Sequence, residues 1–322
     1  MKEGSRLEYR KLGTSDLNIS TVGYGCWAMG HAFWGEDVVD EESVAAVKLA
    51  FSLGINFYDT AQAYGCGHSE RVLAQGIADL PRDQVIIATK TGLQWDADEN
   101  ITRNSSPEYI ASSLDDSLDR LRTDYIDLFQ VHWPDPDVPI KDTAAGMKAC
   151  LDSGKIRAAG VSNYSVEQMT EFMEVCPLHS LQPPYSMLTR DIEAEILPFC
   201  REHNIGVLAY SPMARGLLTG KYDENATFPE SDARSNSPMF KGERLAKNVA
   251  AVRELAAMAE TEGRTAAQLA LAWVLAQPGL TCALAGAKRP DQIAETAAAS
   301  GWTLTPEQLA QIDAIIEKHG AG

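Results

Sequence analysis

The sequence predicts an α/β protein built as an eight-stranded (β/α)8 barrel, the TIM barrel fold, and three observations support this. Short apolar segments alternate with helix-like segments along the chain. Several of the apolar segments contain almost no polar residues, as strands do when helices cover both faces of a parallel sheet. No Gly-x-Gly-x-x-Gly motif follows the first strand, which disfavours the runner-up, an open doubly wound sheet. Because no linker or change of composition divides the chain, we expect residues 1–322 to form one barrel domain.

The predicted strands are short apolar segments that end at polar residues or glycine. In chain order they cover residues 21–25, 55–59, 85–90, 125–132, 156–161, 180–182, 206–210 and 281–285. Ahead of the first strand, short alternating stretches broken by Gly13 and Asp16 predict a small N-terminal β-hairpin.

Helices are predicted between the strands, where apolar residues recur at helical spacing. Asp40 is predicted to cap the first helix, Ser106 the third, and Ser165 with Gln168 to form a capping box. After a long polar segment at 211–242, helical patterns return, and residues 305–308 are predicted to cap a final helix. We therefore expect extra helices near the C-terminus.

Composition and charge limit the possible partners. The chain has a formal net charge of −17, so its surface should repel nucleic acid and anionic membranes. No apolar run is long enough to span a membrane, and the N-terminus lacks a signal-peptide pattern. The six cysteines lack the spacing of a zinc site or a disulfide framework. We expect a soluble, cytoplasmic protein with free thiols, no metal centre, and no nucleic-acid or membrane partner.

Polar residues of complementary type lie at the ends of successive predicted strands. Asp59, Lys90 and His132 are at the C-terminal ends of strands two, three and four, where barrel enzymes place their active sites. Tyr64 follows in a glycine-containing loop after the second strand. Since neighbouring strands are about 4.8 Å apart, these side chains can meet across the rim of a barrel.

The chemistry of this group is that of a general acid. An unperturbed tyrosine titrates near 10, so we expect the Lys90 ammonium to lower the pKa of Tyr64 and Asp59 to hold Lys90 charged. His132 can position a substrate oxygen by donating a hydrogen bond. The set contains no nucleophile with an adjacent base and no metal-ligand pattern.

Over essentially its whole length, the sequence resembles the aldo-keto reductase family. The resemblance rests on residues 23–27, 57–61, 64–65, 69–70, 88–90, 130–132, 160–163, 182, 210–221 and 286–288. It implies that Asp59, Tyr64, Lys90 and His132 are the catalytic tetrad and that Tyr64 is the proton donor. It also implies NADP(H) as the cofactor, with NADPH as the source of hydride, and a small carbonyl compound as the substrate. Oligomeric state stays open.

Two other functions are alternatives to a reductase. Potassium-channel β-subunits share this resemblance and act chiefly through a partner, so an NADP-binding regulatory subunit is the main alternative. They typically carry Asn where this chain has His132, which disfavours that role. A barrel lyase using Lys90 as a Schiff base ranks last, because a lysine held charged by Asp59 is a poor nucleophile.

The cofactor site is expected along the same rim. Ser162, Asn163 and Gln182 can hydrogen-bond a carboxamide, and Tyr210 can stack on a nicotinamide ring. Lys288 and Arg289 stand before the helix that Pro290 opens, where fixed cations and a helix N-terminus favour a phosphate. The remaining positions implied by the resemblance are Cys26, Trp27, Ser211, Pro212, Met213, Ala214, Gly216, Leu217, Gly220, Lys221, Arg234, Gly286, Gln292 and Glu295. Thr296 stands where the family commonly has Asn, which puts one adenine contact in doubt.

Aromatic residues are expected at the substrate mouth. Trp27, Trp34, Trp95 and Trp133 fall on or beside loops at the C-terminal face, as does Phe33. They can form an apolar opening for aldehydes or ketones, or serve only as loop packing.

Overall fold

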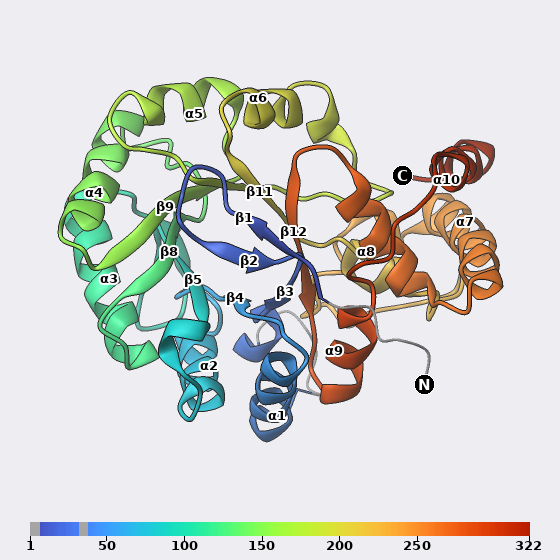
Figure 1. Cartoon of the computed structure of the whole chain (residues 1–322), viewed down its shortest axis with the longest axis horizontal. Coiled ribbons are helices and arrows are strands. Elements are labelled where there is room, and N and C mark those ends of the chain that lie inside the picture. The colour runs from blue at the N-terminus through green and yellow to red at the C-terminus, as the bar shows by residue number, and fades with distance from the viewer. Residues whose placement is uncertain (1–6, 32–37) are drawn as a thin grey trace.

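The computed structural model describes residues 7–31 and 38–322. Parallel strands form a closed barrel in the order β10-β11-β12-β3-β4-β5-β8-β9 (Figure 1). These strands are β3 (Val22–Gly25), β4 (Phe57–Asp59), β5 (Ile86–Thr91), β8 (Ile126–Val131), β9 (Ile156–Ser162), β10 (Ser180–Gln182), β11 (Gly206–Ala209) and β12 (Leu280–Gly286). The predicted fold class is confirmed.

Helices surround the barrel on the outside (Figure 1). They are α1 (Asp40–Ser52), α2 (His68–Ile77), α3 (Pro107–Leu121), α4 (Ile140–Asp152), α5 (Val166–Met173), α6 (Ile196–Glu202), α8 (Ala266–Ala276) and α9 (Pro290–Ala297). Two further helices, α7 (Gly242–Thr261) and α10 (Pro306–His319), pack against each other at one side. They are the extra helices predicted near the C-terminus.

The predicted N-terminal hairpin is present and closes one end of the barrel. Its strands are β1 (Tyr9–Lys11) and β2 (Asn18–Ser20), and Leu12, Leu17 and Ile19 join the apolar residues of the barrel interior. The turn needs Gly13, because its φ is +52° and an added Cβ would lie 2.4 Å from the His179 carbonyl oxygen. A site with access to solvent therefore belongs at the opposite end.

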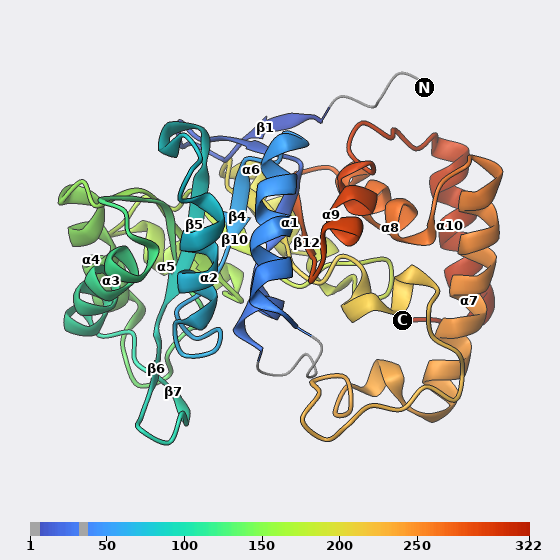
Figure 2. The same cartoon turned by 90° about the horizontal axis from the view of Figure 1, so that it is seen from below.

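That opposite end carries irregular segments that the sequence did not predict. A second hairpin, β6 (Leu93–Trp95) and β7 (Ile101–Arg103), projects there, away from β1 (Figure 2). Within the polar segment 211–242, the structure forms the short 3-10 helices η4 (Ala214–Thr219) and η5 (Pro238–Phe240). In the part of the chain that is described, no helix is long and apolar enough to cross a membrane.

The capping predictions had mixed outcomes. The Ser106 cap and the Ser165–Gln168 capping box are present. Asp40 does not cap α1: it is the first residue of the helix, and the N-cap position is Val39. The Asp40 carboxylate instead pairs with the imidazole rings of His31 and His68.

Candidate active site

The structure brings Asp59, Tyr64 and Lys90 together at the C-terminal end of the barrel. Asp59 is the last residue of β4, and Lys90 lies near the end of the adjacent strand β5. The Lys90 Nζ lies 2.7 Å from Asp59 Oδ2 and 3.2 Å from the Tyr64 hydroxyl, and donates to the Thr60 carbonyl at 2.8 Å. Lys90 is fully buried, so these contacts replace the water that a charged amine would otherwise bind.

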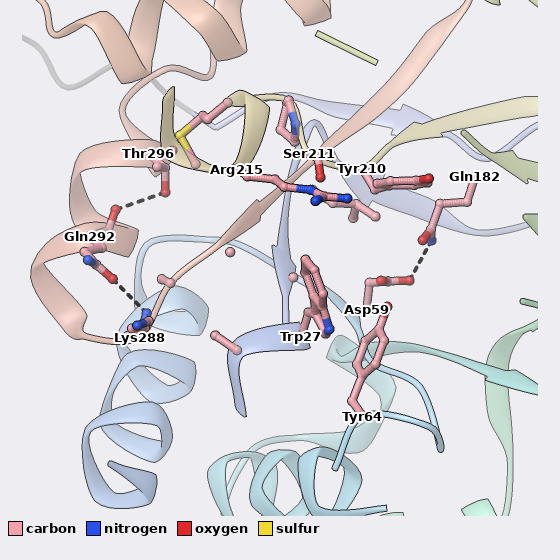
Figure 3. A pocket seen from close by; sticks show the side chains of 18 of the residues that line it. Trp27, Asp59, Tyr64, Gln182, Tyr210, Ser211, Arg215, Lys288, Gln292 and Thr296 are labelled. Carbon is pink, nitrogen blue, oxygen red and sulfur yellow. Dashed lines mark hydrogen bonds between the residues drawn. The ribbon is translucent and has the colours of Figure 1, made fainter. Parts of the chain in front are cut away.

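The second oxygen of Asp59 is held from other strands. Gln182 donates its Nε2 to Asp59 Oδ1 at 2.8 Å (Figure 3), and Gln130 donates to the same oxygen at 3.4 Å. From the sequence, we expected the Gln182 amide to bind the carboxamide of a cofactor. In the structure, this amide donates to the Asp59 carboxylate. Asp59 is fixed by strands β5, β8 and β10 together.

Tyr64 and His132 face each other across the site. His132 follows β8 directly, and its ring meets the Tyr64 ring edge-on, with centroids 5.7 Å apart. The loop that carries Tyr64 presses against the end of η1 (Trp27–Gly30). A Cβ on Gly65 would lie 2.3 Å from the Gly30 carbonyl oxygen, so this contact requires glycine.

Burial and charge fix the protonation of these groups. Burial raises the pKa of Tyr64 above its usual value, although the Lys90 ammonium opposes this. The expectation of a lowered tyrosine pKa was therefore wrong, because desolvation outweighs the cation. Burial alone would lower the pKa of Lys90, but Asp59 and Tyr64 reverse this and raise it. Burial, assisted by Lys90, holds the pKa of His132 well below its usual range. At neutral pH the site holds a protonated tyrosine, a charged lysine and a neutral imidazole.

A cavity of about 630 Å³ extends from these residues towards α9. Figure 3 shows Tyr64 and Asp59 at one end and Lys288 and Gln292 at the other. The wall includes most residues expected to bind cofactor or substrate: Trp27, Trp133, Ser162, Asn163, Gln182, Tyr210, Ser211, Pro212, Met213, Gly216, Lys221, Gly286, Lys288, Gln292 and Glu295. Gly286 pairs with Gly25 of β3, and because both line the cavity, no side chain protrudes into it at these positions.

Other expected residues do not line the cavity. These are Cys26, Trp95, Ala214, Leu217, Gly220, Arg234 and Arg289. Cys26 is fully buried, Arg234 pairs with the buried Asp232, and Arg289 pairs with Asp291 at the surface. The expected substrate residue Trp34, and Phe33 beside it, lie outside the described residues.

Arg215 is a cavity residue that the sequence reasoning missed. Its side chain extends into the cavity beside Ser211 and Tyr210 (Figure 3). Ser211, Ala214 and Arg215 all have left-handed backbone, with φ of +53°, +48° and +55°, a conformation that is uncommon for non-glycine residues. Arg215 falls inside the stretch 210–221 on which the family resemblance rests, so its position in that stretch was the signal that could have identified it.

The far end of the cavity is ordered by α9. Gln292 accepts a hydrogen bond from the Lys288 backbone at 2.8 Å. Thr296, which also lines the cavity, donates its hydroxyl to the Gln292 carbonyl at 3.1 Å. Its only hydroxyl proton is therefore directed into the helix, so Thr296 faces a ligand chiefly as an acceptor.

A closed parallel barrel with an Asp, a Tyr, a Lys and a His clustered at its C-terminal rim is typical of one class of oxidoreductases. The model of the Aldo/keto reductase family matches residues 21–317, and the chain belongs to that family. Its members use a nicotinamide cofactor and bind small carbonyl substrates.

Within this family, the chain is similar to several characterised or solved proteins. The aldo-keto reductase YhdN of Bacillus subtilis (strain 168) is 42% identical, with 97% of this chain and 94% of that protein covered. An NADH-specific methylglyoxal reductase of Escherichia coli (strain K12) is 36% identical, with coverage of 89% and 92%. Among solved structures, the glycerol dehydrogenase AKR11B4 of Gluconobacter oxydans matches with a TM-score of 0.91 at 40% identity, over 98% of this chain and 96% of that one.

Proposed function

We propose that this chain is a cytoplasmic, NADP(H)-dependent reductase that converts aldehydes and ketones to alcohols, with Tyr64 as the general acid. The main support for this proposal is the position of the Lys90 Nζ, which lies 2.7 Å from Asp59 and 3.2 Å from the Tyr64 hydroxyl. Burial keeps Tyr64 protonated until it acts. Once the proton is donated to the carbonyl oxygen, the adjacent ammonium stabilises the phenolate that remains.

His132 positions the substrate in this proposal. Its imidazole is neutral at physiological pH and therefore has one N–H to donate to the carbonyl oxygen beside Tyr64. Trp27 and Trp133 supply apolar surface at the same end of the cavity, which suits the carbon skeleton of an aldehyde or ketone.

The described residues fit a nicotinamide cofactor, which when bound supplies the hydride for the carbonyl carbon. Tyr210 presents a ring whose hydroxyl is anchored on Asn163 Oδ1 at 3.0 Å, so a flat aromatic surface is held beside the tetrad. The segment from Ser211 to Gly216, in which Ser211, Ala214, Arg215 and Gly216 have positive φ, brings backbone close to the cavity, as phosphate-binding loops do.

Lys288 favours NADP(H) over NAD(H) in our proposal. It lines the cavity immediately before α9, where a cation and a helix N-terminus act together on an anionic group. Because the protein carries a net charge of −17, such local cations are needed to hold a phosphate. The NADH-specific relative shows that family membership alone does not decide this choice.

The proposal is tested by following NADPH and NADH oxidation with a panel of aldehydes, 2-oxo acids and sugars, methylglyoxal included. We expect turnover of at least one aldehyde, with kcat/KM higher for NADPH than for NADH. Tight NADPH binding without turnover of any compound in either direction would contradict the proposed reductase activity and support the alternative of a regulatory subunit.

A further inference from the structure

Two histidines and one aspartate converge outside the catalytic cluster. His31 Nε2 lies 2.8 Å from Asp40 Oδ1, and His68 Nε2 lies 3.0 Å from Asp40 Oδ2. The two rings meet edge-on with centroids 5.0 Å apart. One ligand atom from each of the three side chains lies within 4.8 Å of the others. None of these residues takes part in the proposed reaction.

The conformation of this region brings the three side chains together. Asp40 is the first residue of α1, after the N-cap Val39, and its carboxylate is turned towards the two rings. His31 adopts a left-handed backbone with φ of +60°, which is uncommon for a non-glycine residue. Three separate segments are thus arranged so that their polar atoms meet.

We propose that His31, Asp40 and His68 form a binding site for a divalent transition-metal ion of the Zn²⁺ type. Two imidazoles and one carboxylate are a common zinc ligand set, with metal–ligand distances of about 2.0–2.2 Å. Ligand atoms around a tetrahedral ion at those distances are separated by about 3.4 Å. Side-chain rotations that widen the observed separations of 2.8 and 3.0 Å and keep the two imidazole ligand atoms, now within 4.8 Å of each other, near that spacing would admit the ion.

Exposure and charge agree with an open site. The side chains of His31, Asp40 and His68 are 45%, 34% and 39% exposed, so water can fill a fourth position. The N-termini of α1 and α2 disfavour a cation, but the first turn of α1 contains the acids Asp40, Glu41 and Glu42. The net charge of −17 also favours cation binding.

The ion would join two segments that form the cavity wall. His31 directly follows η1, which carries Trp27, and His68 begins α2 just after the loop that carries Tyr64. These segments already touch through Gly30 and Gly65. The bound ion would therefore clamp together two parts of the candidate active site.

Titration of the full-length, chelator-treated protein with Zn²⁺ and Co²⁺ tests the site. Calorimetry should give one Zn²⁺ per chain, and Co²⁺ should give the visible absorption of a tetrahedral site without thiolate charge-transfer bands. We expect His68→Ala and Asp40→Asn each to weaken binding at least about tenfold, and the exposed His203→Ala, remote from the cluster, to leave it unchanged. Asp40→Asn keeps the side-chain shape, so a folding defect does not obscure the result.

Two results would overturn the proposal. If wild type and both variants bind Zn²⁺ equally, the three residues form only a hydrogen-bonded cluster. If Co²⁺ shows strong thiolate bands, the ion lies on a cysteine, and the half-exposed Cys66 becomes the first candidate.

Discussion

Two buried ionic clusters occupy opposite parts of the barrel, and they differ in what they leave available. In one, Lys90 binds Asp59 and Tyr64 beside the cavity. In the other, Asp127 near the start of β8 accepts hydrogen bonds from Arg82 at 2.8 Å, from Arg157 at 2.8 Å and from a backbone N–H of β5 at 3.0 Å. Both clusters pair a buried carboxylate with cations.

The difference lies in the groups that surround each carboxylate. The contacts of Asp127 join one strand or loop to another. They stabilise the fold and present no group to the cavity. The Asp59–Lys90 pair instead supports Tyr64, which faces the cavity together with His132 and holds a proton that a ligand can reach. A buried ion pair therefore indicates function only when it controls a protonated group that a ligand can reach.

Lys90→Met should have the largest combined effect. It leaves Asp59 buried without its cation, so the free energy of unfolding should fall by about 3–5 kcal/mol. The kcat should also fall at least ~10²-fold, because the phenolate of Tyr64 loses its stabilising charge. Urea unfolding and steady-state kinetics measure the two effects. In combination with Tyr64→Phe, the losses in kcat should not add.

The matched control is Lys48→Met, which removes an exposed pair with Asp79 and should cost less than about 1 kcal/mol. A Lys90 variant no less stable than this control would show that the buried pair contributes nothing to folding.

Asp127→Asn should affect stability without affecting activity. We expect a loss of about 3 kcal/mol, at the low end for a buried pair, because Arg82 and Arg157 are partly exposed and can bind water. The kcat and the Kd for NADPH should match wild type when measured on folded protein. A tenfold loss of kcat would mean that the two clusters are coupled, and the contrast drawn above would fail.

Lys288→Ala should weaken NADPH binding by ~1–3 kcal/mol, the range of a charge-assisted hydrogen bond. NADH binding should hardly change, because NADH lacks the 2′-phosphate. Arg289→Ala is the control: Arg289 lies beside the cavity and pairs with Asp291, so its loss should matter less. Fluorescence titration with both cofactors decides this, and equal losses for NADPH and NADH would remove Lys288 from the 2′-phosphate.

Another prediction concerns the reactivity of the cysteine thiols, where we expect the smallest effect. Cys26 and Cys282 are buried, and burial, with the nearby Asp59 carboxylate adding to it, raises the pKa of both thiols, whereas Cys66 is only partly buried. In the native protein a thiol reagent should modify Cys66 first, slowly, because burial raises its pKa. Unfolded, unreduced protein should yield six thiols. A count of four or two would reveal a disulfide and contradict the prediction.

The sequence predicted the regular elements and the clustering of polar residues at one rim because both follow from local patterns. Strand and helix periods located the elements, and polar residues at successive strand ends placed Asp59, Lys90 and His132 on one rim. The β6–β7 hairpin escaped prediction, since its strands lack a clear alternation. The partners of Asp40 escaped as well, because His31 and His68 reach it only through the tertiary fold.

Quantities that depend on burial were also beyond the sequence. Lys90 was expected to lower the pKa of Tyr64, but the extent of desolvation, which reverses the direction, is set by the whole barrel end. In the same way, the left-handed backbone that directs Arg215 into the cavity is visible only in the structure.

The single-turnover rate of Tyr64→Phe with NADPH and a reactive aldehyde tests the central claim most directly. Tyr164→Phe is its control, because the Tyr164 hydroxyl is buried and has no hydrogen-bond partner among the described residues. We expect the Tyr64 variant to lose ~10²–10⁴-fold in rate, with NADPH affinity and stability nearly unchanged, and the Tyr164 variant to match wild type. A Tyr64→Phe rate within a few-fold of wild type would show that the proton comes from another group, with His132 the first candidate.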